Sequence, residues 1–170
     1  DVQGKEIPQI IDDDGTQVKV ITGEFWGQHG PVDGVAADPL YLDITVPANR
    51  RKAFKVDTYR NTFDYIFEGA GKFADASMPQ GVLSEKEVCG EELNIRDMSG
   101  NRTLVLFGDG DEVAVTSGEQ GVRFLLISGA PLREPVAWHG PIVMNTQAEL
   151  QQAMRELNNG TFIKTGAAGW

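Results

Sequence analysis

The stretch PLREPVAWHGPIVMNT, residues 131–146, is the most distinctive part of the chain and is called the strap below. Pro135 and Pro141 each remove a backbone donor and hold φ at about −65°, so the strap is predicted to run as an extended, kinked segment rather than as a helix. Thr146 and Glu149 have the spacing of a capping box, in which a hydroxyl and a carboxylate satisfy two backbone amides. A helix is therefore predicted to begin directly after the strap.

The strap and the helix-like segment behind it resemble the signature near the C-terminus of the pirin family, whose members are double-cupin proteins. The resemblance continues upstream in the order expected of the second pirin cupin domain, through VKVITGEFWG (18–27), LYLDITVPA (40–48), FDYIFEGAG (63–71) and FGDGDEVAV (107–115). It implies an all-β fold, a cupin-type β-sandwich or barrel of the jelly-roll kind, with a short C-terminal α-helix. The strap is the specific part of this resemblance, because runs such as FGDGDEVAV are general β-hairpin sequence.

The composition agrees with a single all-β domain. The 170 residues suffice for one hydrophobic core, and 20 glycines among many short apolar runs predict numerous turns. A net charge of −10 argues against a face that binds nucleic acid or an anionic membrane. No run approaches the roughly 18 apolar residues of a membrane span, and a lone cysteine, Cys89, suits a reducing compartment. A cytoplasmic location is therefore expected.

The chain is expected to fall into four segments. Residues 1–16 are predicted to be a linker, 17–145 the cupin barrel with an excursion at 74–100, 146–160 the helix, and 161–170 a tail. The first residues, DVQGKEIP, contain neither an initiator methionine nor an apolar signal sequence. Together with the resemblance, this start predicts that the chain is the second half of a longer protein.

Within the barrel, apolar alternation predicts strands beginning at Val18, over 40–46 and over 63–67. Arg50, Arg51 and Lys52 are expected in a turn, and Gly69 and Gly71 are expected to end the 63–67 strand in another. Later strands are predicted at TLVLF, EVAVT and VRFLLIS, joined by glycine-rich hairpin turns at 108–111 and 118–121.

Histidine is scarce where a metal-binding cupin needs it. A catalytic cupin would project a His-x-His pair and a glutamate from the strand near 63–67, but the run from Asp57 to Phe67 contains no histidine. The two histidines of the chain, His29 and His139, lie far apart, and neither has a second ligand two positions away in a strand. We therefore expect no metal ligand and no catalytic residue in this chain, and we expect His139 to be structural.

The pirin resemblance implies a division of labour between two domains. It implies iron held by three histidines and a glutamate of the N-terminal domain, with quercetin 2,3-dioxygenase-like activity or a role as a redox or transcription cofactor. This chain is then expected to be a metal-free C-terminal cupin domain that supports that iron-binding domain, its main partner, and not to be catalytic alone. The strap residues expected to serve structure or the interface are Arg133, Glu134, Pro135, Trp138, His139, Gly140, Pro141, Met144 and Asn145.

Two other functions remain open at this point. An independent small-molecule-binding or dioxygenase cupin would use the barrel mouth, where the candidate pocket residues are Tyr59, Phe63 and Tyr65. A protein-interaction module in transcriptional regulation would use the acidic surface to bind another protein rather than DNA.

The predicted helix, about 147–157 with Gly160 as its stop, carries one apolar stripe. Its members, three and four positions apart, are Leu150, Ala153, Met154 and Leu157. The stripe packs either on its own domain or on the companion domain, and a homodimer of the fragment through the strap is a further alternative.

Overall fold

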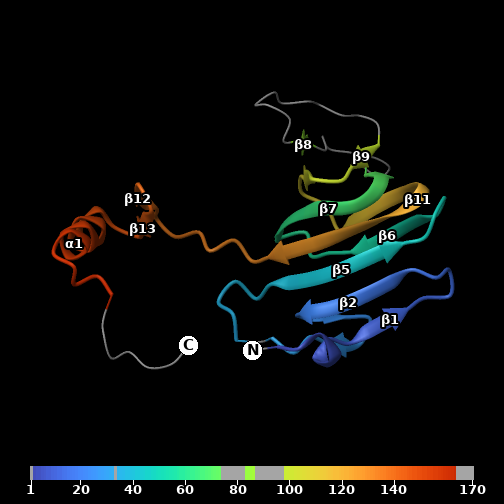
Figure 1. Ribbon diagram of the computed structural model, residues 1–170, viewed down its shortest axis with the longest axis horizontal. Helices are drawn as coiled ribbons and strands as arrows, with labels where there is room; N and C mark the ends of the chain where they lie inside the picture. Colours follow the sequence, from blue (N-terminus) through green and yellow to red (C-terminus); the bar gives the residue numbers. More distant parts are fainter. Residues whose placement is uncertain (1, 33, 74–82, 87–97, 164–170) are drawn as a thin grey trace. The chain divides into compact units, whose positions relative to one another are not determined.

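The computed structural model describes residues 2–32, 34–73, 83–86 and 98–163, without side-chain detail for 83–86. The chain separates into two compact units, Asp1–Pro131 and Leu132–Trp170, which are taken one at a time. The first unit is built almost entirely of strands, and the second contains a small hairpin and the helix (Figure 1). The expected cupin segment 17–145 thus extends over the boundary between the two units.

The first unit contains a nine-stranded sheet in the order β1-β2-β5-β11-β7-β10-β8, to which β6 adds by pairing with β11 and β9 by pairing with β7. Every pairing between these strands is antiparallel. A separate hairpin joins β3 to β4. The all-β prediction is confirmed. The elements, with a short 3-10 turn at Gly4–Glu6, are β1 (Gln9–Ile11), β2 (Gln17–Thr22), β3 (Glu24–Phe25), β4 (Gln28–His29), β5 (Leu40–Val46), β6 (Arg51–Lys55), β7 (Asn61–Lys72), β8 (Leu83–Lys86), β9 (Ser99–Gly100), β10 (Thr103–Leu106) and β11 (Glu112–Gly129).

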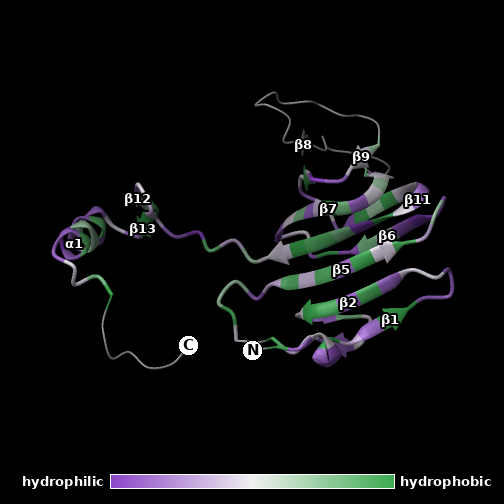
Figure 2. Cartoon of the chain, in the orientation of Figure 1, coloured by the Kyte–Doolittle hydropathy of each residue, from purple (hydrophilic) through white to green (hydrophobic). Residues whose placement is uncertain are grey.

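Alternation of side chains along the strands builds the core of this unit. Along β5, Leu42, Ile44 and Val46 are fully buried while the residues between them are partly exposed. Figure 2 shows the same alternation as hydrophobic and hydrophilic bands along β2, β5 and β11. Phe124 on β11 lies at the centre, packing edge-on against Phe54 at 6.0 Å between ring centroids. Burying each such side chain contributes about 1.5–3 kcal/mol, so this inward-facing set holds the sheet together.

The longest strands differ from the sequence prediction. Turns were expected after residue 67 and at 118–121, but β7 continues to Lys72 and β11 runs unbroken from Glu112 to Gly129. The register of the two strands shifts between Ser117 and Val122, which marks a β-bulge. Both predicted turns are therefore wrong, because the glycines bend the strands without reversing the chain.

Two shorter segments also differ. Residues 9–11, expected within a linker, form β1 and pair with β2. Arg51 and Lys52, expected in a turn, begin β6 and lie opposite Thr116 and Val115 of β11. The strand predicted over 40–46 is confirmed as β5.

The second unit combines a hairpin with the helix. Strands β12 (Ala137–His139) and β13 (Ile142–Met144) pair around Gly140, whose φ of 56° permits the tight turn, so the strap is not extended throughout. Helix α1 (Gln147–Asn158) begins as predicted. The backbone amide of Thr146 donates to Glu149 Oε2 at 2.9 Å, and that of Glu149 donates to Thr146 Oγ1 at 3.2 Å, which confirms the capping box.

The apolar stripe of α1 is partly buried within its own unit. Leu150 and Ala153 are buried against Ala137 and Ile142 of the hairpin. Leu157, the last member of the stripe, is 44% exposed. Across the described residues, no helix combines the length and the apolar character needed to cross a membrane.

Candidate functional site

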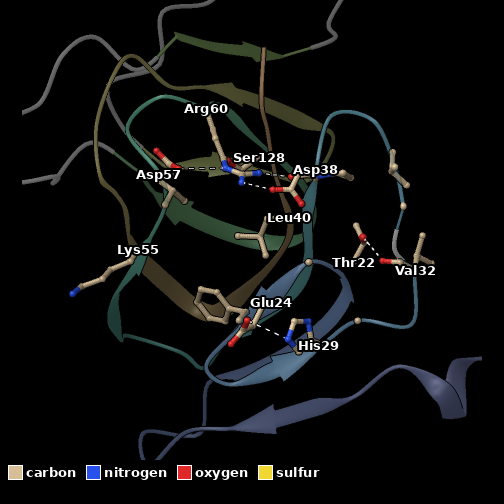
Figure 3. A pocket seen from close by; sticks show the side chains of 17 residues that line it. Thr22, Glu24, His29, Val32, Asp38, Leu40, Lys55, Asp57, Arg60 and Ser128 are labelled. Atoms are coloured by element: carbon tan, nitrogen blue, oxygen red, sulfur yellow. Dashed lines mark hydrogen bonds and ion pairs between the residues drawn. The ribbon is translucent and has the colours of Figure 1, made fainter. Parts of the chain in front are cut away.

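A cavity of about 840 Å³ opens at one end of the large sheet in the first unit. Residues at the end of β2, in the β3–β4 hairpin, at the start of β5 and at the ends of β6 and β11 contribute to its walls (Figure 3). Its volume lies in the range of small-molecule sites, about 300–1,000 Å³. Its position, where several strands end and loops take over, is one from which side chains of different elements can converge.

The floor of the cavity is apolar and continuous with the core. Leu40 and Val56 line it and also pack against the main hydrophobic cluster. Phe25, only 7% exposed, joins them, and its ring centroid lies 6.3 Å from that of buried Phe54. This part of the wall is therefore fixed by core packing before any ligand arrives.

The loop that forms another wall is held against β2. Thr22 Oγ1 donates a hydrogen bond of 2.5 Å to the carbonyl of Val32, and the amide of Gly30 donates to the carbonyl of Gly23 at 2.9 Å. A side chain at Gly30 would come within 2.5 Å of the Ile21 backbone, so glycine is needed for this approach. These contacts make the loop wall a preformed surface.

Arg60 joins two loops of the cavity wall. Its Nη2 donates to Asp38 Oδ2 at 2.6 Å, its Nη1 donates to the Asp38 carbonyl, and its Nε lies 3.6 Å from Asp57 Oδ2. The Arg60 side chain is 24% exposed. The guanidinium is thus held between two carboxylates, where its planar fork suits this arrangement better than an ammonium would.

The β3–β4 hairpin brings a second charged pair to the rim. His29 Nε2 lies 3.2 Å from Glu24 Oε2, and both side chains are well exposed. Trp26 and Gly27, which connect the two strands, have φ of 45° and 75°, as the favoured two-residue hairpin turns require. Figure 3 shows the Glu24–His29 pair across from the Arg60 group, with Leu40 between them.

The aromatic residues predicted at the barrel mouth lie elsewhere. Tyr59 is 83% exposed, Tyr65 is 38% exposed, and Phe63 is half-buried. None of the three belongs to the described lining of the cavity. The residues that do line it come partly from the segment over 28–39, which was interpreted as a loop, and partly from the ends of predicted strands, as at Leu40 and Ser128. Nothing in the sequence indicated that these segments meet.

The strap residues occupy the second unit with different degrees of exposure. Asn145 Nδ2 donates to Glu134 Oε2 at 2.9 Å and to the Pro135 carbonyl at 3.1 Å, so these three residues close the base of the hairpin. His139 is exposed, and Trp138 is 73% exposed, with its Nε1 donating to the Gly140 carbonyl at 2.7 Å. The remaining strap residues divide between an exposed set, Arg133 and Pro141, and a partly buried one, Met144.

The donors of the described residues do not fit an iron site. Across that part of the chain, no three His, Cys, Asp or Glu side chains gather as a metal-binding group. His29 and His139 belong to different units. On β7, where a metal-binding cupin would carry its histidines, the fully buried residues are Asp64 and Ile66. A single carboxylate without imidazoles is a poor match for non-haem iron.

Cys89 and most of the 74–100 excursion lie outside the described residues.

Asp64 is the most unusual titratable group of the first unit. It is fully buried, and neither carboxylate oxygen has a hydrogen-bond partner. Burial raises the pKa of Asp64 well above the ordinary 3.8, because the charged form is poorly solvated there. The sequence placed this residue in a strand but offered no sign that it would face inward.

Comparison with known proteins identifies the family. The pirin C-terminal cupin domain model matches residues 41–163. A pirin-like protein of Arabidopsis thaliana is 35% identical over 162 residues, which are 94% of this chain and 53% of that protein. A pirin-like protein of Caulobacter vibrioides is 34% identical over 157 residues, 92% of this chain and 49% of that protein. The chain therefore spans about half the length of these relatives.

Comparison with a solved structure supports the same fold. The crystal structure of quercetin 2,3-dioxygenase from Acinetobacter baumannii is 26% identical, with a TM-score of 0.70, over 95% of this chain and 49% of that one. Its agreement with the antiparallel sheet and short helix confirms the predicted cupin fold. The sequence match and the shared fold together show that this chain belongs to the family of pirin C-terminal cupin domains.

Proposed function

We propose that this domain is the supporting half of a two-cupin protein and packs against a preceding cupin domain. In this proposal the preceding domain holds iron and carries out the chemistry, which is quercetin 2,3-dioxygenase-like or a redox role in transcription. The family description places the domain at a C-terminus, and the matched dioxygenase structure is about twice as long as this chain. Both observations support a partner domain of similar size.

The apolar surface of the second unit carries the proposal. Its buried core is small, formed by Ala137, Ile142, Leu150 and Ala153. Large apolar side chains between 58% and 81% exposed outnumber that core, namely Leu132, Val136, Trp138, Val143 and Ile163. A unit this short buries too little apolar surface to be stable alone. An exposed apolar surface of this kind is typical of a docking surface.

Trp138 is the best candidate for the centre of that surface. Its indole N–H is already satisfied by the Gly140 carbonyl at 2.7 Å, so the polar atom of the ring needs no further partner. The hairpin turn thereby holds the ring in one orientation while it remains 73% exposed. A preorganised tryptophan loses little entropy on binding and is a frequent interface hot spot.

The proposed occupant of this surface is the preceding cupin domain rather than a second copy of the chain. The relatives are about twice as long as the matched region, which leaves room in them for a second domain, and covalent linkage would give such a domain a high effective concentration. Homodimerisation of the isolated chain would be a competing use of the same surface.

The test is to produce this chain and the cupin domain that the proposal places upstream as separate proteins. Their association is then measured by calorimetry. We expect a one-to-one complex in which Trp138→Ala weakens binding at least about ten-fold. Tyr59→Ala, which removes a similarly exposed aromatic ring (83% against 73%) from the first unit, is the matched control and should bind as the unmodified chain does.

Equal binding by the two variants would contradict the proposal, as would a stable homodimer of the chain that excludes the other domain. Iron analysis gives a second criterion. Iron should remain with the upstream domain, whereas stoichiometric iron in this chain alone, lost on substitution of His29 or His139, would show independent metal chemistry.

A further inference from the structure

We propose that the cavity in the first unit binds a small organic cation, an ammonium group carried on an apolar or aromatic body. The cavity belongs to the first unit alone and shares no residue with the docking surface of the second. Ligand binding in the cavity is therefore independent of the proposed pairing of this domain with a preceding cupin domain.

The shape and floor of the cavity indicate the body of the ligand. A volume of about 840 Å³ exceeds what a few waters need and suits a ring-sized molecule. Phe25, Leu40 and Val56 present an apolar floor that is fixed by the core behind it. An apolar group placed on this floor would bury hydrocarbon surface of both the ligand and the protein. Each Å² of apolar surface removed from water contributes about 25 cal/mol of favourable free energy.

The charges of the wall select against an anion. Among the described lining residues are three carboxylates, Glu24, Asp38 and Asp57, and two cations, Lys55 and Arg60. With histidine neutral, this leaves one net negative charge inside a protein whose total is −10. An incoming anion would meet this excess without compensation, and a cation would relieve it.

The positions of the two cations strengthen this selectivity. Arg60 is held by Asp38 at 2.6 Å and by Asp57 at 3.6 Å, so an anionic ligand would have to compete with two carboxylates already in place. Figure 3 shows the Lys55 side chain pointing away from the other labelled side chains. Neither cation is therefore presented as an anion-binding group.

Glu24 is the carboxylate best placed to receive the ammonium. It lies on the β3–β4 hairpin next to Phe25, so one short segment presents both a charge and an apolar ring. Its side chain is 59% exposed despite the 3.2 Å contact with His29, so the carboxylate keeps open surface for a second partner. A ligand whose ammonium pairs with Glu24 could place its body over Phe25 and Leu40.

Three probes of nearly equal shape test this inference: benzylamine, benzyl alcohol and benzoate, which carry charges of about +1, 0 and −1 near neutral pH. Binding is followed by amide chemical shifts of the isotope-labelled chain at pH 7.5. We expect benzylamine to bind roughly ten-fold more tightly than benzoate, with benzyl alcohol between them, and shifts at Leu40, Val56 and Ser128.

Glu24→Gln should weaken benzylamine binding about three-fold and leave benzyl alcohol unchanged. Glu119→Gln, a control at an exposed position on β11 outside the cavity, should change neither. Tighter binding of benzoate, equal effects of the two variants, shifts outside the cavity, or no saturable binding of any probe would each overturn the inference.

Discussion

Gly69 on β7 and Gly121 on β11 approach so closely that a side chain on Gly69 would lie 2.2 Å from the Gly121 carbonyl oxygen. Both have positive φ, 70° and 77°, in the region that only glycine adopts without strain. Beside them, Val122 pairs with Gly69 directly after the register shift that begins at Ser117. The two longest strands therefore bulge together and remain paired, which keeps the core residues beyond the bulge on the inner face.

Gly69→Ala should lower the free energy of unfolding by roughly 2 kcal/mol or more, because it adds both backbone strain and a clash with the facing strand. Urea denaturation followed by tryptophan fluorescence measures this change. Gly110→Ala is the matched control, since no atom lies within 4 Å of the added methyl group. Indistinguishable midpoints for the two variants would show that the bulge is not a tight constraint.

The bulge also explains which parts of the fold could be predicted. The strand over 40–46 and the helix after Thr146 were predicted correctly. Both predictions rest on local patterns, the alternation of apolar and polar residues and the capping-box spacing, which involve residues close together in the sequence. Residues 118–121 were misinterpreted, because glycine with positive φ serves both a hairpin turn and a bulge. The distinction depends on the partner strand, here around Gly69, which lies about fifty positions away in the sequence.

The cavity was even less predictable. Its wall depends on a contact between Arg60 and Asp38, 22 positions apart in two loops without a regular pattern. The sequence instead suggested Tyr59, with Phe63 and Tyr65, as aromatic residues lining the barrel mouth. The structure places Tyr59 in a turn in which its amide donates to Asp57 Oδ1 at 3.0 Å, and its ring is exposed to solvent.

Lys52 should control the acid stability of the first unit. It contacts Asp12 and lies 2.9 Å from Asp14 Oδ2. Burial is the largest single influence and raises the pKa of Asp14, but the hydrogen bonds from Thr16 and Lys52 together outweigh it and lower the pKa to about 2. The stabilisation by Asp14 is therefore complete above the ordinary value of 3.8 and is lost as the pH falls towards about 2.

In Lys52→Gln, the Asp14 titration midpoint should move up towards 3.8, which carboxyl NMR measures directly. Because less stabilisation is then left to lose, unfolding free energy should fall less steeply with acid than in the unmodified chain. Lys5→Gln, at an exposed position, should leave the slope unchanged. An unmoved Asp14 midpoint would mean that the lysine contact does not set this pKa.

The capping box should stabilise α1 measurably. Thr146→Ala removes the oxygen that accepts from the Glu149 amide at 3.2 Å and should destabilise the helix by about 1 kcal/mol. Thr146→Ser keeps a cap and is the matched control. Amide hydrogen exchange over Gln147–Asn158 is the measurement, with faster exchange expected in the first turn of the alanine variant only. Equal exchange in both variants would assign the helix start to packing alone.

Asp64 should produce a pH dependence opposite in sign to that of Asp14. Burial holds the pKa of Asp64 well above 3.8, so the folded protein keeps this carboxyl neutral at pH values where the unfolded chain ionises it. Above about pH 4, unfolding therefore releases a proton. Stability should decline as the pH rises from there towards the folded pKa, by up to about 1.4 kcal/mol per pH unit.

Asp64→Asn removes the ionisable group while nearly preserving its size, so the variant should lack this decline. Urea unfolding at about pH 5 and about pH 8 measures the difference, and the unmodified chain should lose more stability between the two. Asp13→Asn, at an exposed position, should follow the unmodified chain. Parallel pH profiles for Asp64→Asn and the unmodified chain would require Asp64 to be charged in the folded state. A buried carboxylate without a partner could be charged there only with a cation or ordered water beside it.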